Sequence, residues 1–292
     1  MAIAVAGCAG SGVQPKIEPT RATNSATASP AATSHIAKVI VFILENHSLD
    51  QMKKGLPYTF GVAKQYGYAS HYSAITHPSL PNYLAITGGS LSKVHDDNSP
   101  SKHELKGQSV FGQAIAAGKT AGVYADAMKT NCEQKDDGTY IVHHNPWAYY
   151  ASERAECQQF DVPLAQLTTD AAAGTLPNVG MVVPDVCHDA HSCPLSSADA
   201  WMKVWLPKVM SGPDWLSGQL AVVITADEGY KRLPGNSVLT SLAYLGEKSQ
   251  IVRTKLTHYS LTRLYEDVAG VPRLGHAATA RSLSKAFGFT IG

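Results

Sequence analysis

The sequence predicts an α/β fold with a mostly parallel central sheet and helices on both faces. Residues 36–44 and 220–226 are unbroken apolar runs of strand length, which is typical of strands buried on both faces of a parallel sheet. Helical patterns lie between these runs and the other strand candidates. Strands that alternate with helices favour a parallel sheet covered on both sides.

The expected elements follow from periodicity and from the residues that end each pattern. Gly118 and Gly270 stand directly after two of the helical patterns, where glycine commonly ends a helix. In the longest pattern, Trp201 and its apolar neighbours recur at helical spacing and are expected in the core. The strand candidates are residues 38–44, 68–74, 122–125, 179–183, 221–225 and 239–245, and the helical patterns are residues 80–87, 109–117, 197–210 and 260–269.

Composition and length restrict the class of protein. The chain has 292 residues, of which 44% are hydrophobic and 16% charged, enough for one large or two small domains. No linker rich in Gly, Pro or Ser interrupts the chain after residue 34, which favours a single domain over residues 35–292. The net charge is +1 without a dominant basic patch, so nucleic acid is not an expected partner. No apolar run reaches the length of a membrane-spanning helix.

The first residues resemble a processing signal. Residues 1–8 end in Val-Ala-Gly-Cys, which resembles a bacterial lipobox, although no basic region precedes it. In this interpretation Cys8 is lipidated and anchors a secreted or cell-envelope lipoprotein to a membrane; the alternative is an ordinary tail of small residues. Residues 9–34 are rich in Ala, Ser, Thr, Gly and Pro and are expected to form a disordered spacer.

Four cysteines remain besides Cys8. An even number in an exported protein favours disulfides, and sequence order favours the pairs Cys132–Cys157 and Cys187–Cys193. Metal–thiolate binding is the alternative, but the sequence lacks a CxxC pair.

Acidic residues follow the two apolar runs directly. Glu45 and Asn46 come after the first run, and Asp227 and Glu228 come after the second. Ligands of open α/β sheets bind beyond the carboxyl ends of such strands, and clusters of hard oxygen ligands there hold divalent metals. A capping role for Asn46 at the start of a helix is the alternative interpretation.

Ser79 begins a helical segment within the stretch THPSLPNY. A hydroxyl at the first turn of a helix lies where the dipole and backbone N–H groups favour anions, with Asn82 close by as a further donor. Coordination to a metal would make this hydroxyl a nucleophile. Capping by Ser79 or Thr76 is the alternative, and no GxSxG motif is present.

Further titratable residues lie in loops after strands. Asp185, His188, Asp189 and His191 fall within or beside the loop bounded by Cys187 and Cys193, and carboxylates with imidazoles suit Zn, Fe or Mn. His143, His144 and His258 are each candidates for a ligand, a general acid or a phosphate clamp, although a single His is more often structural.

The ordered set of motifs resembles a known family. Glu-Asn after the first strand, His-Pro-Ser-x-Pro-Asn-Tyr, His-Asn-Pro-Trp, Pro-Asp with His-Asp, Asp-Glu-Gly and Thr-His-Tyr-Ser resemble the bacterial phosphoesterase family. That family includes secreted acid phosphatases and non-specific phospholipases C and belongs to the alkaline-phosphatase-like superfamily. The resemblance covers about residues 38–275 and implies an alkaline-phosphatase-like fold.

The resemblance also implies residue roles. Ser79 is implied as the nucleophile, and Asp227-Glu228 stands where the wider superfamily has Asp-His, which favours one hard metal or a mixed pair over two zinc ions. Metal identity is left open among Ca, Mg, Mn, Zn and Fe. The implied sets are Glu45, Asn46, Asp227 and Glu228 for the metal, Asp185 and Asp189 for a second metal position, His144, His188 and His258 for phosphate binding or proton transfer, and His77 and Asn82 for substrate binding.

The expected activity is hydrolysis of phosphomonoesters through a phosphoserine, with a small-molecule or lipid phosphate ester as substrate. A phospholipase C acting on phosphodiesters is the nearest alternative. A non-catalytic, metal-stabilised binding lipoprotein is a further alternative, which the presence of Glu45, Ser79, Asp227 and His258 disfavours. No Cys-x-Pro-x-Arg stretch is present to supply the nucleophile of a sulfatase.

Overall fold

The computed structural model describes residues 1–4, 35–230 and 235–292. The described helices and strands all lie within the unit Thr33–Gly292. Cys8 and the expected spacer over residues 9–34 lie outside the described residues.

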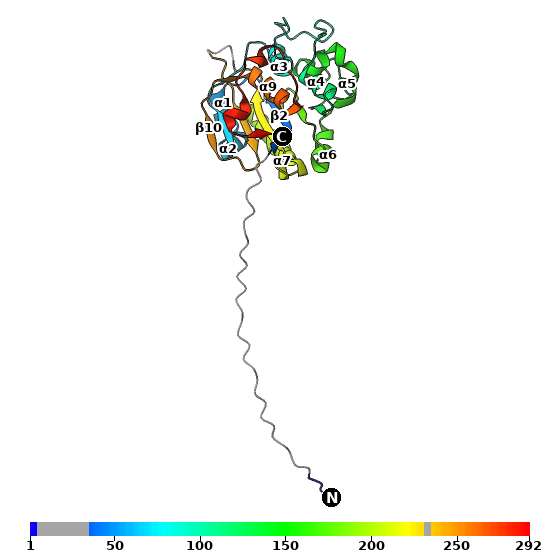
Figure 1. The fold of residues 1–292 in the computed structure, drawn as a ribbon, viewed down its shortest axis with the longest axis vertical. Helices are drawn as coiled ribbons and strands as arrows, with labels where there is room; N and C mark the ends of the chain where they lie inside the picture. Colours follow the sequence, from blue (N-terminus) through cyan, green and yellow to red (C-terminus); the bar gives the residue numbers. More distant parts are fainter. Residues whose placement is uncertain (5–34, 231–234) are drawn as a thin grey trace. The chain divides into compact units, whose positions relative to one another are not determined.

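An eight-stranded sheet forms the centre of the fold (Figure 1). Its strand order is β10-β3-β9-β8-β2-β7-β5-β6. Only β9 runs antiparallel to its neighbours among the described strands, so the sheet is mostly parallel, as predicted. The strands are β2 (Lys38–Leu44), β3 (Gly67–Ala69), β5 (Ala121–Ala125), β6 (Asp161–Pro163), β7 (Val179–Val183), β8 (Leu220–Ala226), β9 (Thr240–Tyr244) and β10 (Gln250–Val252).

Two small parallel sheets lie beside the main one. The first pairs β1 (His35–Ile36) with β12 (Thr290–Ile291), and the second pairs β4 (Tyr72–Ser73) with β11 (Leu256–Thr257). The second small sheet matters for the site because β4 and β11 lead into the segments that carry Ser79 and His258.

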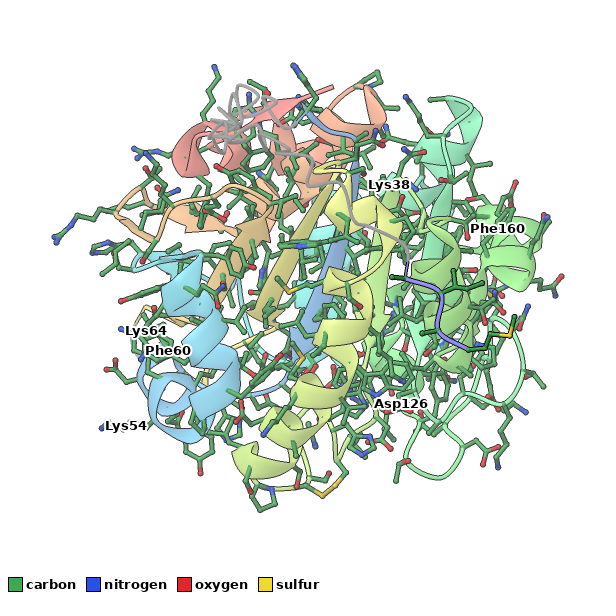
Figure 2. The ribbon with its side chains drawn as sticks, turned by 90° about the horizontal axis from the view of Figure 1, so that it is seen from below. Lys38, Lys54, Phe60, Lys64, Asp126 and Phe160 are labelled. Atoms are coloured by element: carbon green, nitrogen blue, oxygen red, sulfur yellow. A yellow bond between two sulfur atoms is a disulfide. The ribbon has the colours of Figure 1, made fainter. Side chains whose placement is uncertain are left out.

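Helices pack against both faces of the sheet (Figures 1 and 2). The helices α4 and α9 contact β7, with α3 packed against α9, whereas α2 and α6 both pack against α7. The helices are α1 (Leu49–Gly55), α2 (Pro57–Gln65), α3 (Ser79–Gly88), α4 (Val110–Ala116), α5 (Arg154–Phe160), α6 (Ala165–Ala173), α7 (Leu195–Met210), α8 (Pro213–Leu216), α9 (His258–Ala269) and α10 (Leu283–Phe287), with short 3-10 helices at Val142–His144, Pro146–Tyr149, Ala151–Glu153 and Gly275–Ala278.

The central strands form the centre of the hydrophobic core because their side chains are apolar on both faces of the sheet. From Val39 to Leu44 every residue of β2 is fully buried, as are most residues of β8. Trp201 of α7 packs edge-on against Phe42 with ring centroids 6.1 Å apart, so the tryptophan belongs to the core as expected. Figure 2 shows Lys38, at the start of β2, and Asp126, just after β5, at opposite ends of the sheet. The carboxyl ends of the parallel strands therefore share one edge.

Most predicted elements are present with small shifts in their ends. Residues 38–44 and 179–183 form strands with the predicted bounds. The single strand predicted over residues 68–74 is wrong, because β3 and β4 are separate strands that pair with different partners. Ser70 and His71 mark the break, where Ser70 N–H donates to the Val252 carbonyl and the His71 carbonyl accepts from Leu256.

Candidate active site

Glu45 and Asp227 are the first residues after two neighbouring strands. In the parallel pair of β2 and β8, Leu44 lies opposite Ala226, so the two acids that follow meet at the carboxyl edge of the sheet. Both acidic side chains are fully buried. Asn46 has a left-handed φ of 49°, a conformation that Asn tolerates better than most residues, and its N–H donates to Oδ1 of Asp227 at 3.2 Å.

Ser79 is the first residue of α3, and its side chain faces the same two acids. Its Oγ donates a hydrogen bond to Oε2 of Glu45 at 3.1 Å. Burial raises the pKa of Asp227 well above its ordinary value, the charge of Glu228 raises that pKa further, and the nearby Ser79 hydroxyl offsets a part of the rise. The N-terminus of a helix favours negative charge, so this hydroxyl lies where a phosphoryl group is stabilised.

Asn82 holds the loop that leads to Ser79. Its Oδ1 accepts hydrogen bonds from two backbone N–H groups of residues 75–78 at 3.0 and 3.1 Å, and its Nδ2 donates to two carbonyl oxygens of the same loop at 2.9 and 3.1 Å. The same Nδ2 donates to Oε2 of Glu228 at 3.2 Å. Oε1 of Glu228 lies 2.9 Å from Nδ1 of His77. This network fixes the position of the serine relative to the second acidic pair.

The other oxygen of Glu45 faces a second buried group. Oε1 accepts a hydrogen bond from the Tyr83 hydroxyl and lies 3.6 Å from Nε2 of His144. Nδ1 of His144 lies 3.1 Å from Oδ2 of Asp189, and the Tyr83 ring stacks on the imidazole. One ligand atom from each of Glu45, His144 and Asp189 lies within 4.8 Å of the others, and we name these three residues the buried cluster.

Three polar atoms around Glu45 are buried without a hydrogen-bond partner among the described residues. They are Nε2 of His144, Oδ2 of Asp227, and Oδ2 of Asp189, whose 3.1 Å approach to Nδ1 of His144 does not have the geometry of a hydrogen bond. A buried polar atom without a partner is rare and requires an explanation such as a bound ion. Carboxylate oxygens and an imidazole nitrogen are suitable ligands for a divalent metal. The residues present therefore fit a metal ion held beside Ser79.

The electrostatics of the buried cluster support the same conclusion. Burial raises the pKa of Glu45 well above its ordinary value, and the charges of Asp227 and Asp189 raise it further. Burial raises the pKa of Asp189 to about 8 and lowers the pKa of His144 to about 3. A divalent cation favours the charged forms of these acids, because metal ligands bind deprotonated.

His258, the first residue of α9, lies behind Asp227. Its Nε2 is 2.5 Å from the backbone oxygen of Asp227, and its Nδ1 is 3.1 Å from the Tyr72 hydroxyl. The ring is fully buried, and burial lowers the pKa of His258 to about 4. Because both ring nitrogens have partners, the contacts of His258 hold the Asp227 backbone in place.

A second set of acids and histidine lies at the same edge of the sheet. Nδ1 of His188 is 2.7 Å from Oδ2 of Asp126 and 3.1 Å from Oδ1 of Asp185. Trp201 Nε1 donates to the same Asp126 oxygen at 2.9 Å, and Thr139 donates to Oδ2 of Asp185 at 2.7 Å. The side chain of His188 is 41% exposed. We name Asp126, Asp185 and His188 the rim cluster.

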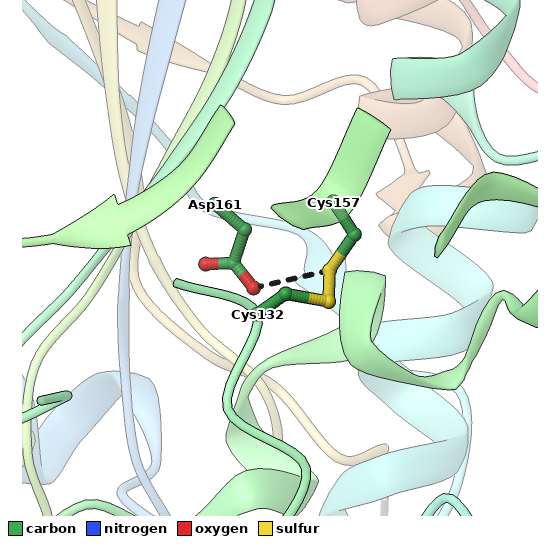
Figure 3. Close-up of side chains that lie close together, drawn as sticks. All are labelled: Cys132, Cys157 and Asp161. Carbon is green, nitrogen blue, oxygen red and sulfur yellow. Dashed lines mark hydrogen bonds between the residues drawn. A yellow bond between two sulfur atoms is a disulfide. The ribbon is translucent and has the colours of Figure 1, made fainter. Parts of the chain in front are cut away.

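Both predicted disulfides are present, and Cys132–Cys157 supports the segment that carries His144. Oδ2 of Asp161 contacts Sγ of Cys157 at 3.5 Å (Figure 3) and accepts a hydrogen bond from Nδ2 of Asn145 at 2.8 Å. Asn145 directly follows His144, so the disulfide is linked to the buried cluster through one buried carboxylate. Cys187–Cys193 closes the loop that carries His188 and Asp189.

Comparison with known proteins identifies the family. The sequence model of the phosphoesterase family matches residues 51–230, more than half of the chain. The chain belongs to the phosphoesterase family. The matched part of this phosphoesterase includes Ser79, His144, Asp189, Asp227 and Glu228, whereas Glu45 precedes it and His258 follows it.

Relatives of this phosphoesterase are phosphatases. A phosphatidylinositol-3-phosphatase of Mycobacterium tuberculosis is 23% identical over 264 residues, which cover 88% of this chain and 85% of the relative. An acid phosphatase of Aspergillus fumigatus is 23% identical over 219 residues, 70% of this chain and 49% of the relative. A phosphate-repressible acid phosphatase of Penicillium chrysogenum is 25% identical over 77% of this chain and 57% of the relative. The chain thus spans about half the length of the fungal relatives.

Solved structures confirm the predicted alkaline-phosphatase-like fold. A protein of the alkaline phosphatase superfamily from Vibrio parahaemolyticus has a TM-score of 0.57 and 10% identity, with 87% of this chain and 72% of that one covered. The lipoteichoic acid synthase LtaP from Listeria monocytogenes has a TM-score of 0.58 and 10% identity, with 85% and 77% covered. In the described part of this phosphoesterase, no helix is long and apolar enough to cross a membrane.

The predicted site residues fall into two groups. Ser79, Glu45, Asp227, His144 and Asp189 come together, and Asn46 and His258 contact Asp227. Asn82 and His77 contact Glu228, the residue after Asp227. Asp185 and His188 lie instead in the rim cluster. Asp185 was expected to share a second metal position with Asp189. Its Oδ1 accepts the N–H groups of Cys187 and His188 and so caps the disulfide loop, and its cluster with Asp126 and His188 has the side chains of a possible metal site.

Sequence reasoning missed three residues of the site. Asp126 directly follows β5, the same signal of an acid after a buried strand that pointed to Glu45 and Asp227. Tyr83 lies one helical turn after Ser79, a spacing that places both on one face of α3. Asp97 accepts the Leu80 N–H at 2.9 Å and so binds the first turn of α3, and no local sequence pattern indicates this contact.

Two cavities lie outside this group. The larger, about 670 Å³, is lined by residues of β5, β6 and α6 and contains none of the site residues. The smaller, about 570 Å³, lies beside the loop that follows α3 and is lined by Ser90, Leu91, Ser92, Lys93, His95, Tyr259 and His276.

Proposed function

We propose that this phosphoesterase is a metal-dependent phosphatase that hydrolyses phosphomonoesters with Ser79 as the nucleophile. The observation that carries this proposal is the position of the Ser79 hydroxyl. It lies at the start of α3, 3.1 Å from the buried carboxylate of Glu45 and beside Asp227. A nucleophile, an anion-favouring helix end and a cluster of metal-type ligands thus occupy one place.

The residues that would hold the metal are Glu45 and Asp227, with His144 and Asp189 on the far side of Glu45. Support comes from the three buried atoms without partners among the described residues, which all belong to these side chains. Asn46 and Glu228 remain predicted ligands, since the Asn46 N–H donates to Asp227 and Glu228 directly follows Asp227. When bound, a divalent ion neutralises charge on the phosphate and lowers the pKa of a hydroxyl or water beside it.

The reaction proceeds in two displacements at phosphorus. Oγ of Ser79 attacks, the Oγ–P bond forms as the bond from phosphorus to the leaving oxygen breaks, and the alcohol departs with a proton. Water then attacks the phosphoserine, the Oγ–P bond breaks, and inorganic phosphate leaves. Glu45 holds the hydroxyl before attack, and Asn82 keeps the loop before Ser79 fixed.

The three histidines predicted to bind phosphate or transfer protons have different surroundings. For His258 we propose a positioning role, because both of its nitrogens are engaged and it supports the Asp227 backbone. For His144 we propose a ligand role beside Glu45. His188 is the most exposed of the three and is the one with direct access to solvent for proton transfer.

A lipid phosphomonoester is a second candidate substrate. The observation that favours it is the phosphatidylinositol-3-phosphatase relative, which matches nearly the full length of both chains. A phospholipase C activity is distinguished by its product. Inorganic phosphate released from a phosphoinositide indicates a phosphatase, and a phosphorylated headgroup released from the lipid indicates a phospholipase C.

We also infer that the chain is exported. Two disulfides support this inference, because disulfides persist in oxidising compartments and are rare in the cytosol. Lipidation of Cys8 remains a prediction, and the mass of the mature N-terminus in wild-type and Cys8→Ala protein tests it.

Replacement of Ser79 tests the mechanism directly. We expect Ser79→Ala to reduce hydrolysis of p-nitrophenyl phosphate by at least about 10³-fold, because the covalent step is lost. Thr76→Ala is the matched control, since Thr76 is the other hydroxyl of this loop. Acid-quenched protein incubated with ³²P-labelled substrate should retain label in wild type and lose it in Ser79→Ala. Near-normal turnover by Ser79→Ala together with inactive Thr76→Ala would move the nucleophile to Thr76.

A further inference from the structure

The segments that follow the two acidic pairs each carry a ring. His47 comes directly after Glu45-Asn46, and Tyr230 comes two residues after Asp227-Glu228. Both residues lie at the carboxyl edge of the sheet, just beyond the ends of β2 and β8. Their rings are 23° from parallel with the centroids 6.3 Å apart, a distance within the range of offset stacking. We name His47 and Tyr230 the ring pair.

The imidazole of the ring pair is held close to the proposed nucleophile. Nδ1 of His47 donates to the backbone oxygen of Glu45 at 2.8 Å, and the carboxylate of the same glutamate accepts from Ser79 at 3.1 Å. Two hydrogen bonds and the length of one glutamate therefore separate the imidazole from the Ser79 hydroxyl, which is at most about 13 Å. A phosphate at Ser79 that carries a ring on its ester oxygen spans such a distance together with its contacts at either end.

The loop that carries Tyr230 is fastened to the loop that leads to Ser79. The Gly229 N–H donates to Oδ1 of Asn236 at 2.7 Å, and Nδ2 of Asn236 donates to the Thr76 carbonyl at 2.9 Å. A Cβ at Gly229 would lie 3.0 Å from the same Asn236 oxygen, so glycine permits this close approach. The backbone before Tyr230 therefore has a fixed position relative to the proposed nucleophile.

The ring pair is open to solvent, whereas the reacting groups are buried. Tyr230 is 38% exposed and His47 is half-buried, but Ser79 is only 4% exposed and the two acids beside it are fully buried. An in-line displacement sends the leaving oxygen away from the attacking hydroxyl, so the alcohol part of an ester projects out of the buried group. It then meets the exposed border of the site, to which the ring pair belongs, and aromatic rings commonly line ligand sites.

We propose that the ring pair binds the leaving group of the substrate, so that the preferred substrates are phosphate esters of phenols and other aromatic alcohols. This proposal rests on the proposed function, because it places the reacting phosphate at Ser79. The Tyr230 ring packs against the ring of the leaving group, and His47 supports the Tyr230 ring from the strand end. A small polar alcohol such as glycerol lacks the flat apolar face that makes this contact.

The experiment compares aromatic with polar leaving groups. Phenyl phosphate, 1-naphthyl phosphate and glycerol 2-phosphate are each given to wild type, Tyr230→Ala and Tyr230→Phe. We expect Tyr230→Ala to lower kcat/KM for the two aryl phosphates by about threefold to tenfold, since one ring-to-ring contact is lost. Glycerol 2-phosphate should change less than about twofold, a range typical of exposed substitutions. Tyr230→Phe should stay within about twofold of wild type for all three substrates, because it keeps the ring.

Leu245→Ala is the matched control. Leu245 is 41% exposed, close to the exposure of Tyr230, and it directly follows β9. The last residue of β9, Tyr244, pairs with Ala221 near the start of β8, so Leu245 lies at the opposite edge of the sheet from the proposed site. Its replacement should leave the ratio of kcat/KM between aryl and glycerol phosphates unchanged.

The outcomes separate the two proposals. Equal loss for all three substrates in Tyr230→Ala, or no loss for any, overturns the binding of the leaving group by the ring pair. A loss in Tyr230→Phe as large as in Tyr230→Ala assigns the effect to the hydroxyl and also overturns it. Calorimetric binding of phenylphosphonate and methylphosphonate, which are not hydrolysed, is measured in parallel.

The phosphonates give a result that does not depend on turnover. If the wild type hydrolyses nothing, the proposed function fails. Threefold or weaker binding of phenylphosphonate by Tyr230→Ala, with methylphosphonate unchanged, still supports the ring pair. A wild type that binds neither phosphonate, or binds both equally, overturns it.

Discussion

The buried cluster and the rim cluster contain the same kinds of side chain, but they differ in how many of their polar atoms have hydrogen-bond partners. Each has two carboxylates and one imidazole at the carboxyl edge of the sheet. In the rim cluster both oxygens of Asp126 and of Asp185 accept hydrogen bonds, from Ala127, Trp201 and Thr139 among others. In the buried cluster, Nε2 of His144 and Oδ2 of Asp189 have no such partner among the described residues.

Burial explains why this difference matters. In the rim cluster each carboxylate oxygen already accepts a hydrogen bond from the protein, so no polar atom of its carboxylates is left without a partner. The carboxylates of the buried cluster have raised pKa values because water is excluded and because they repel one another. Residue type alone therefore does not distinguish the two clusters, whereas the unsatisfied buried atoms do.

The largest expected effect comes from Glu45, the residue shared by Ser79 and the buried cluster. Glu45→Gln should lower kcat/KM for p-nitrophenyl phosphate by about 10³-fold or more, because metal-assisted charge stabilisation is worth several kcal/mol. Steady-state kinetics measure it. Asp185→Asn is the matched control in the rim cluster and should cost less than about tenfold, since Asn keeps the oxygen that caps the loop.

The two disulfides should differ in their effect on stability. Cys132–Cys157 closes a separation of 25 residues and Cys187–Cys193 one of only 6. In the chain-entropy account, removal costs about 3.5 and about 2 kcal/mol respectively. Urea unfolding of the two double Cys→Ala variants measures the difference. If removal of Cys187–Cys193 destabilised the protein more than removal of Cys132–Cys157, native contacts of the rim cluster would contribute more to stability than loop entropy does.

A smaller effect is expected from Asp161, the carboxylate that links the first disulfide to Asn145. Burial raises its pKa to about 8, above the ordinary value near 4 in an unfolded chain. The folded state therefore binds this proton more tightly than the unfolded chain does. The stability that protonated Asp161 contributes to the folded protein is complete below about pH 4 and is lost as pH rises towards 8. From this one group, the free energy of unfolding changes by at most about 1.4 kcal/mol per pH unit.

Asp161→Asn tests this pH dependence. Its unfolding free energy, measured by urea titration from pH 4 to 8, should fall less steeply with pH than that of wild type. Identical slopes for the two proteins would mean that Asp161 is ionised in the folded state.

Much of the fold could be predicted because the signals are local. The buried strands that end at Leu44 and Val183 have their predicted bounds, since continuous β-branched runs occur in few other settings. The antiparallel direction of β9 could not be predicted, because the direction of a strand depends on the connection that precedes it rather than on its own pattern. The helices α1 and α2 were missed because Pro57 and two glycines interrupt their periodicity.

The site was predictable only in part. Glu45 and Asp227 follow buried strands, so their meeting follows from parallel pairing. The division of Asp185 and Asp189 between two clusters could not be predicted, because it depends on the turn inside a disulfide loop, where Asp185 caps and Ala190 adopts a left-handed φ of 76°. The contact of Tyr83 with Glu45 likewise depends on how α3 meets the sheet.

Metal content per chain is the most direct test of the central claim, that Ser79 acts beside a metal held by Glu45 and Asp227. Elemental analysis of purified wild type, Glu45→Gln and Asp126→Asn, paired with phosphatase assays before and after chelation, measures it. We predict at least one divalent metal per chain in wild type and Asp126→Asn and a sharp loss in Glu45→Gln. Activity should disappear on chelation and return with one of Ca²⁺, Mg²⁺, Mn²⁺, Zn²⁺ or Fe²⁺. Full activity in metal-free wild-type protein would contradict the account.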